Sequence, residues 1–152
     1  MRWVLLAYRL PREPSTPRIT LWRQLRRLGV AQVADGVVAL PLDARTREQL
    51  EWLADEVIER GGEATVWLGE PGSAAQERSL ARQMADAVQR EYERVVAEAV
   101  LAGGNIVARR RTLSRLRREL HRIRSRDFFP SVAGDRARAA VEALGDRVES
   151  VS

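Results

Sequence analysis

The residues of this chain best suited to chemistry are its arginines, which make up all 26 of its basic side chains. A guanidinium group stays charged at every physiological pH, and its planar fork of donors grips phosphates, carboxylates and oxyanions at two points. The arginines are unevenly spread: residues 1–30 hold seven against one acid, and residues 109–127 hold nine against two. Residues 31–108 hold seven arginines against 14 acids. This segregation predicts two basic surfaces that bind an external polyanion or cover the acidic middle of the chain.

The stronger candidate for a polyanion surface is the second basic block. Its arginines surround a narrow apolar stripe at helical spacing, and an exposed helix of this kind would neutralise several phosphates with a steep salt dependence. The arginines that we assign to it are Arg110, Arg111, Arg115, Arg118 and Arg122. The alternative is a solvated face paired with acids of a long preceding helix, namely Glu77, Asp86, Glu91, Glu93 and Glu98. Either way the pattern indicates electrostatics without base readout.

The first basic block is a second candidate contact. Its residues are Arg18, Arg23, Arg26 and Arg27, and the last three share one face of a predicted helix because they are three and four residues apart. A plain solvated helix face explains them as well. No helix-turn-helix spacing accompanies them, so we expect phosphate contact at most.

Enzymatic signatures are poor, and we expect no catalysis, no metal and no cofactor. The chain has no cysteine, which excludes disulfides, thiolate metal sites and thiol reduction of a substrate. The lone His121 cannot build a metal site by itself, and it lies among arginines as a surface residue. No phosphate-loop glycine pattern or HExxH motif is present. Asp35 and Asp43 have the settings of a turn residue and a helix cap.

The first 70 residues predict the element order βαββαβ. Strands are expected at 3–10, at 30–42 as a hairpin around Asp35-Gly36, and at 64–68. Helices are expected from Thr16 as N-cap to a stop at Gly29, and from a capping box of Thr46 and Gln49 to Gly61-Gly62. This order is that of the ferredoxin-like α+β fold, with two helices on one face of an antiparallel sheet.

The rest of the chain predicts helices alone. One of about 27 residues spans 74–101, a second begins near Ile106 or Thr112 and ends near Arg126, and a third covers 133–148. We therefore expect a ferredoxin-like subdomain over 1–70 and a helical hairpin with a C-terminal helix over 73–152, packed on it as one structural unit. Trp3, Trp22, Trp52 and Trp67 are expected in the core. No apolar run is long enough to span a membrane, and residues 1–7 read as a strand rather than a signal peptide.

Four phrases in order resemble the N-terminal domain of the ChrB chromate-resistance proteins. They are YRLPREPSTPRITLWRQLRRLG at 8–29, DGVVALP at 35–41, TREQLEWLADEVIERGGEATVW at 46–67 and RELHRIRSRDFFP at 118–130. The resemblance implies a cytoplasmic, chromate-responsive transcriptional regulator associated with DNA. Full-length family members continue into a second domain, so the resemblance also allows a companion chain that carries it.

The element order is also similar to PaaX-type repressors and to small CRISPR-associated nucleases. Those nucleases need an aspartate at the end of the first strand, where this chain has Tyr8 and Arg9, so nuclease activity is not expected. Such domains often pair edge to edge, which implies a homodimer. Three hypotheses follow: a regulator that binds DNA through its arginine-rich helices, a module that docks a companion sensor chain, and a sensor that binds an oxyanion in a buried arginine cluster.

Overall fold

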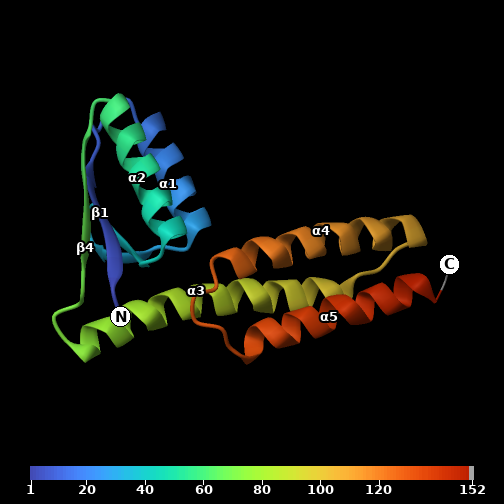
Figure 1. Ribbon diagram of the computed structural model, residues 1–152. Helices are drawn as coiled ribbons and strands as arrows, with labels where there is room; N and C mark the ends of the chain where they lie inside the picture. Colours follow the sequence, from blue (N-terminus) through green and yellow to red (C-terminus); the bar gives the residue numbers. More distant parts are fainter. Residues whose placement is uncertain (151–152) are drawn as a thin grey trace. The chain divides into compact units, whose positions relative to one another are not determined.

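The computed structural model describes residues 1–150, and the chain divides between residues 84 and 85 into two compact units. The element order confirms the predicted α+β class, with βαββαβ followed by three helices (Figure 1). Each unit has its own buried core. The predicted packing of the helical extension on the ferredoxin-like part as one structural unit stays a prediction.

The first unit is built on a four-stranded antiparallel sheet. Its strands are β1 (Trp3–Arg9), β2 (Ala31–Ala34), β3 (Val37–Pro41) and β4 (Glu63–Gly69), in the order β2-β3-β1-β4. Every neighbouring pair is antiparallel. This order confirms the ferredoxin-like prediction, and it leaves β2 and β4 as the two edges of the sheet.

Two helices cover one face of this sheet. They are α1 (Thr16–Leu28) and α2 (Ala44–Glu59), and both are amphipathic (Figure 1). Alternate sheet residues such as Val4, Leu6 and Val38 are buried, because side chains along a strand point to opposite faces. From the helices, Leu25 and Leu50 complete this core with no exposed surface.

The helix ends match the predicted stops better than the predicted starts. The left-handed Gly29 ends α1 as expected, but the N-cap is Ser15 rather than Thr16, and its side chain makes no capping bond. For α2 the capping box joins Asp43 and Thr46, not Thr46 and Gln49. Thr46 is fully buried and also donates to the Pro41 carbonyl at 2.6 Å, so it serves as the third helical residue and not as the cap.

The other face of the sheet meets the beginning of α3 (Ala74–Leu101). The Trp3 indole N–H donates to Glu77 at 3.1 Å, and this bond, with the N-terminal ammonium beside it, lowers the pKa of that carboxyl. The Gln83 side chain bonds both the backbone N–H and the carbonyl of Gln32 on the edge strand β2. Its amide therefore takes the place of a neighbouring strand at that point.

The core prediction for tryptophan is wrong at three of four positions. Trp3 is buried, but Trp22, Trp52 and Trp67 are 48%, 69% and 62% exposed. Trp22 and Trp52 lie beside the buried leucine stripes of their helices and not within them. Trp67 is on the edge strand β4, on the sheet face opposite α1 and α2, where its register partner is Leu5. Aromatic content predicts burial only when the residue also falls on the covered face.

The second unit is a three-helix arrangement around one apolar core. The last part of α3 packs with α4 (Ile106–Ser125) and α5 (Val132–Glu149), close to the predicted bounds (Figure 1). The core includes Val95, Leu116 and Leu144, contributed by the three helices in turn. The buried Tyr92 donates to Asp127 at 2.8 Å, which ties α3 to the residues that follow α4. Within the described residues no helix is long and apolar enough to cross a membrane.

Candidate nucleic-acid interface

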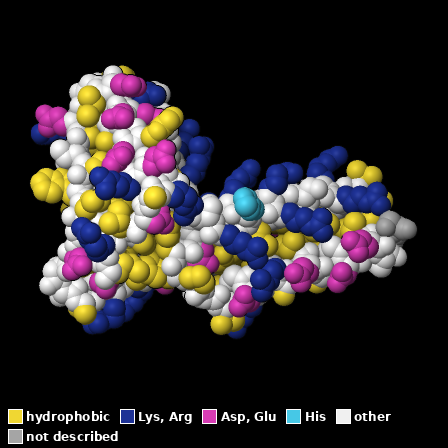
Figure 2. Space-filling model, viewed as in Figure 1, with side chains coloured by type: hydrophobic (Ala, Val, Ile, Leu, Met, Phe, Trp, Pro, Cys, Tyr) yellow, Lys and Arg dark blue, Asp and Glu magenta, His cyan; other side chains and the backbone are white. Residues whose placement is uncertain are grey.

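The exposed face of α4 carries a row of four arginines. Arg111, Arg115, Arg118 and Arg122 follow one another at spacings of four, three and four, which places them on one face of the helix. All four are exposed, and the opposite side of α4 buries its leucines and Ile123 in the core. Figure 2 shows the basic side chains following this helix on the visible face. The arrangement is a helix whose outer surface is cationic along most of its length.

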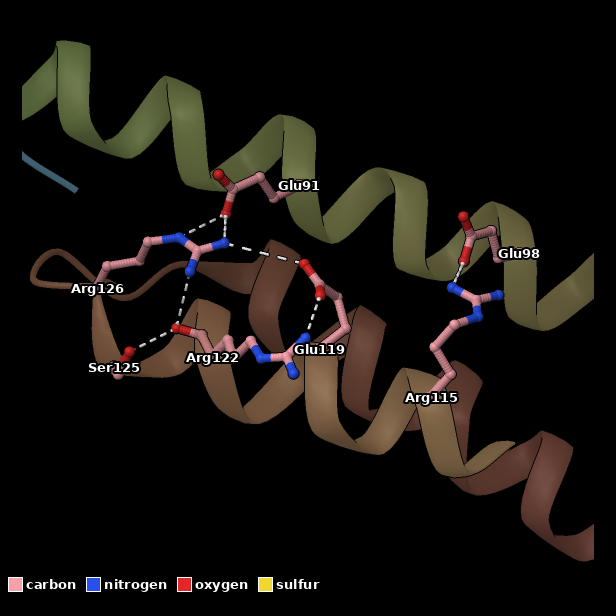
Figure 3. A network of polar contacts seen from close by, with 7 residues as sticks. All are labelled: Glu91, Glu98, Arg115, Glu119, Arg122, Ser125 and Arg126. Atoms are coloured by element: carbon pink, nitrogen blue, oxygen red, sulfur yellow. Dashed lines mark hydrogen bonds and ion pairs between the residues drawn. The ribbon is translucent and has the colours of Figure 1, made fainter. Parts of the chain in front are cut away.

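Two members of this row have acidic partners. The Arg115 Nη1 atom lies 2.8 Å from Glu98 of α3, and Arg122 Nη1 lies 3.4 Å from Glu119 of α4 itself (Figure 3). Both pairs are largely exposed, so each contributes little stability and is screened by salt. Arg115 and Arg122 therefore remain accessible to a competing anion.

Arg126 is the arginine of this block that is committed to structure. Its side chain is 13% exposed, and its Nε and Nη2 atoms lie 2.9 and 2.8 Å from the same Glu91 oxygen (Figure 3). A further contact of 3.9 Å reaches Glu119. The predicted pairing with the acidic side of the long helix thus holds for Glu91 and Glu98. Glu77 instead serves the first unit.

The remaining arginines assigned to α4 are not neutralised by a neighbouring acid. Arg110, Arg111 and Arg118 are exposed and form no ion pair within residues 1–150. Arg117, which we did not assign to the contact surface, also forms no ion pair within the described residues. Its Nη2 atom lies beside Gly145 of α5, 3.3 Å from the position that a Cβ atom would take there. Glu98 of α3 and Glu119 of α4 itself therefore pair with Arg115 and Arg122, whereas Arg111 and Arg118 of the row have no acidic partner in the described chain. Helical spacing could have identified this row, but the division between paired and unpaired members depends on how the helices pack.

The four arginines assigned to α1 are all exposed, and two of them line separate cavities. Arg27 lies in a groove beside Trp52 and Arg45 of α2. Arg18 lies in a different cavity, with Tyr8 and Trp22. Arg23 and Arg26 line neither cavity. That these arginines form a contact surface stays a prediction.

Other chemistries find no support in the described part of the chain. No group of three metal-ligating side chains is present among residues 1–150, and His121 is exposed on α4. Only Arg109 and Arg126 among the arginines are not exposed, and Arg126 is already paired with Glu91. The buried arginine cluster that an oxyanion sensor requires is therefore not present.

The fold and this site define an α+β protein with a ferredoxin-like unit and a three-helix unit whose middle helix has a cationic face. Residues 18–106 match the family model described as "Protein ChrB, N-terminal", and the chain belongs to that family. Among curated proteins it is 29% identical over 140 residues to Protein ChrB of Cupriavidus metallidurans, a match that covers 89% of this chain and 43% of that protein. The chain thus spans less than half the length of that relative.

A solved structure shares the fold. The uncharacterized protein Rv0674 from Mycobacterium tuberculosis superimposes with a TM-score of 0.55 at 16% sequence identity, over 98% of this chain and 62% of that one. At this identity the likeness concerns the arrangement of elements alone.

Proposed function

We propose that this chain is a non-enzymatic regulatory protein of the chromate response, working in the cytoplasm and binding DNA through the arginines of α4. Membership of the Protein ChrB family supports the regulatory role. The observation that carries the DNA contact is the row on α4, in which Arg111 and Arg118 are exposed without an acidic partner in the described chain. The arginines of α1 serve as a secondary contact.

The geometry of α4 suits the phosphate backbone of a duplex. Arg111 and Arg122 are eleven residues apart, which corresponds to roughly 16 Å along a helix, so the row can reach several successive phosphates. Such contacts position a protein on DNA without reading its bases. Sequence preference in this proposal therefore comes from the shape and deformability of the operator, and we infer a homodimer as the active form, with the two copies setting the spacing of the contacts.

Replacing Arg115, Arg118 and Arg122 together by alanine should weaken DNA binding without unfolding the chain. Each lost phosphate contact should reduce the slope of log K against log salt by about 0.9, so the triple variant should lose roughly 2–3 of that slope. The measurement is fluorescence anisotropy with labelled promoter DNA at several salt concentrations. Circular dichroism checks that the helices are intact.

A matched control removes the same charge elsewhere in the same unit. Arg90 of α3 and Arg136 and Arg138 of α5 are all exposed, and none belongs to the α4 row. The R90A/R136A/R138A variant should keep most of the slope. Equal losses in both triple variants would show that net charge, and not the α4 face, governs binding.

Promoter preference and its response to chromate separate regulation from general polyanion affinity. A preference for the upstream promoter over scrambled DNA that persists at physiological salt supports the regulator. Release by chromate would locate the sensor in this chain. Equal, salt-sensitive binding to both DNAs would contradict the regulatory proposal.

A second candidate function is docking of a companion chain that carries a sensor domain. The observation in its favour is the exposed arginine row of α4, which can pair with acids of a partner protein as well as with phosphates. On this proposal the purified chain binds DNA only weakly, and adding the companion chain gives a stable complex in size-exclusion chromatography with light scattering.

A further inference from the structure

A cavity in the first unit lies beside the connection between β1 and α1. Its volume is about 500 Å³, within the usual range for small-molecule sites. Its lining includes Tyr8, Arg18, Leu21, Trp22, Gln32 and Asp35. These side chains come from β1, α1, β2 and the turn between β2 and β3, so four separate segments converge on one space.

The most distinctive phrase of the sequence, residues 8–22, builds this cavity. Tyr8 lies near the end of β1, and the following prolines carry the chain over to α1, which begins at Thr16. The backbone N–H of Tyr8 donates to the Gly36 carbonyl at 2.8 Å and brings the hairpin turn against β1. Arg18 and Trp22 are one helical turn apart on α1 and share a flank.

The charged groups and the tyrosine hydroxyl of this cavity are not used by the fold, whereas the Gln32 amide already donates to the Ala34 carbonyl at 2.7 Å. The Tyr8 hydroxyl forms no hydrogen bond with another described residue. Burial raises its pKa; Arg18 acts in the opposite direction and Asp35 raises the pKa further, so both charges lie near the hydroxyl. Neither Arg18 nor Asp35 has an ion-pair partner among residues 1–150. The cavity therefore presents a cation, an anion and a neutral hydroxyl, all available to a ligand.

The indole of Trp22 supplies a wall of a different kind. It is 48% exposed although it belongs to an amphipathic helix with a well-formed buried stripe, so packing does not explain it. An exposed aromatic ring beside a guanidinium is the arrangement on which planar bases stack in proteins that bind nucleotides. Leu21 adds an apolar surface close by.

We propose that this cavity binds a nucleoside monophosphate whose base carries an exocyclic amino group. The base stacks on Trp22, the phosphate pairs with Arg18, and the Asp35 carboxylate accepts from the amino group. An acidic side chain is the natural acceptor for such a donor, and the Tyr8 hydroxyl completes the polar edge.

Two observations favour a phosphate over a carboxylate at Arg18. This residue is the third of α1, so the positive end of the helix dipole adds to its field, and the Ser15 side chain makes no capping bond there. The cavity is also larger than an aromatic amino acid requires. A free mononucleotide and one nucleotide of a single strand would offer the cavity the same base and phosphate. The test below separates these two sources.

The experiment is isothermal titration calorimetry of the full chain with AMP, inosine monophosphate, adenosine, ribose 5-phosphate, phenylalanine and a short oligodeoxyadenylate. AMP should bind at least tenfold tighter than inosine monophosphate, which lacks the amino group, and tighter than either fragment. Binding of the oligonucleotide alone, with the same dependence on Trp22, also supports the site and assigns it to a strand. The nucleotide proposal is overturned if phenylalanine binds and AMP does not. It is also overturned if neither AMP nor the oligonucleotide binds.

Variants locate the site. W22L and D35N should each weaken AMP binding by roughly tenfold. The matched control is W52L, because Trp52 is also an exposed helical tryptophan but lies on α2 in another groove. Unchanged affinity in W22L, with W52L as reference and folding confirmed by circular dichroism, would overturn the assignment. Loss of AMP binding leaves the α4 contact with DNA untouched, so the two proposals fail separately.

Discussion

Gly36 shows how one residue fixes the geometry of the first unit. It is left-handed with φ of 73°, and a Cβ there would lie 2.6 Å from the Tyr8 carbonyl oxygen. That oxygen belongs to the backbone of β1 and cannot rotate away. The hairpin turn can therefore approach β1 only with glycine at this position.

Replacing Gly36 with alanine should lower the free energy of unfolding by about 1–3 kcal/mol, because the backbone is strained and the added methyl has no room. Gly61 is the matched control: its φ is 85°, but nothing lies within 4 Å of its Cβ position. G61A should cost about 1 kcal/mol, the price of the positive φ alone. Urea denaturation measures the free energy of unfolding of both variants. Equal losses would show that the backbone shifts to relieve the contact with the Tyr8 carbonyl.

At this scale the sequence predicts residues whose role is local and misses those whose role depends on a neighbour. The turn at Asp35-Gly36 and the stop at Gly29 are confirmed, because both depend on backbone conformation within a few residues. The tryptophans are the opposite case. Whether Trp22 or Trp67 is buried depends on which face another element covers, and no local pattern contains that information.

Among elements, the contact between α3 and α4 combines two ion pairs in different surroundings. The Glu91–Arg126 pair is 25% and 13% exposed, whereas Glu98 and Arg115 are 47% and 52% exposed. Water and salt screen the second pair far more than the first.

Double-mutant cycles should separate these two pairs. We expect a coupling energy of about 1–3 kcal/mol for Glu91–Arg126 and about 0.2–1 kcal/mol for Glu98–Arg115, from urea unfolding of the single and double alanine variants. Only the second coupling should vanish in high salt. A coupling of the same size and salt dependence for both would mean that burial does not distinguish them.

Element bounds could be predicted well from the sequence because capping residues and glycines mark them. The long helix was expected over 74–101 and is Ala74–Leu101. The capping box of α2 was placed three residues late, since Thr46 fits both the cap and the third helical position. Only packing against Pro41 decides between them.

For the whole molecule, the acids of α3 limit the charge that α4 can present. E98Q should free Arg115, strengthen binding to any polyanion and steepen the salt dependence by up to about 1 in slope. E93Q makes the same change of charge on α3, but Glu93 interacts with Gln89 of its own helix and should have a smaller effect. Anisotropy titrations with scrambled DNA compare the two, and equal gains would mean that net charge alone matters.

The charge segregation of the sequence predicted an arginine-rich surface, and the structure places exposed arginines along α4. It could not predict that Arg115 and Arg126 are paired, because their partners Glu98 and Glu91 lie on α3, 17 and 35 residues away in the chain. The cavity around Tyr8 and Trp22 was missed for the same reason. Its walls come from segments that only the sheet order brings together.

The binding of the Gln83 amide to the edge strand β2 has a consequence for how the sheet can grow. It occupies the backbone of Gln32, and a register shift between Gln32 and Ala34 distorts the rest of this four-residue edge. The seven-residue edge β4 carries no such block among the described residues, so we expect an added strand there. In two copies joined through β4, this edge of each copy is paired, and the β2 edge of each copy is capped by Gln83. Strand addition then terminates at a closed pair and cannot propagate into a fibre.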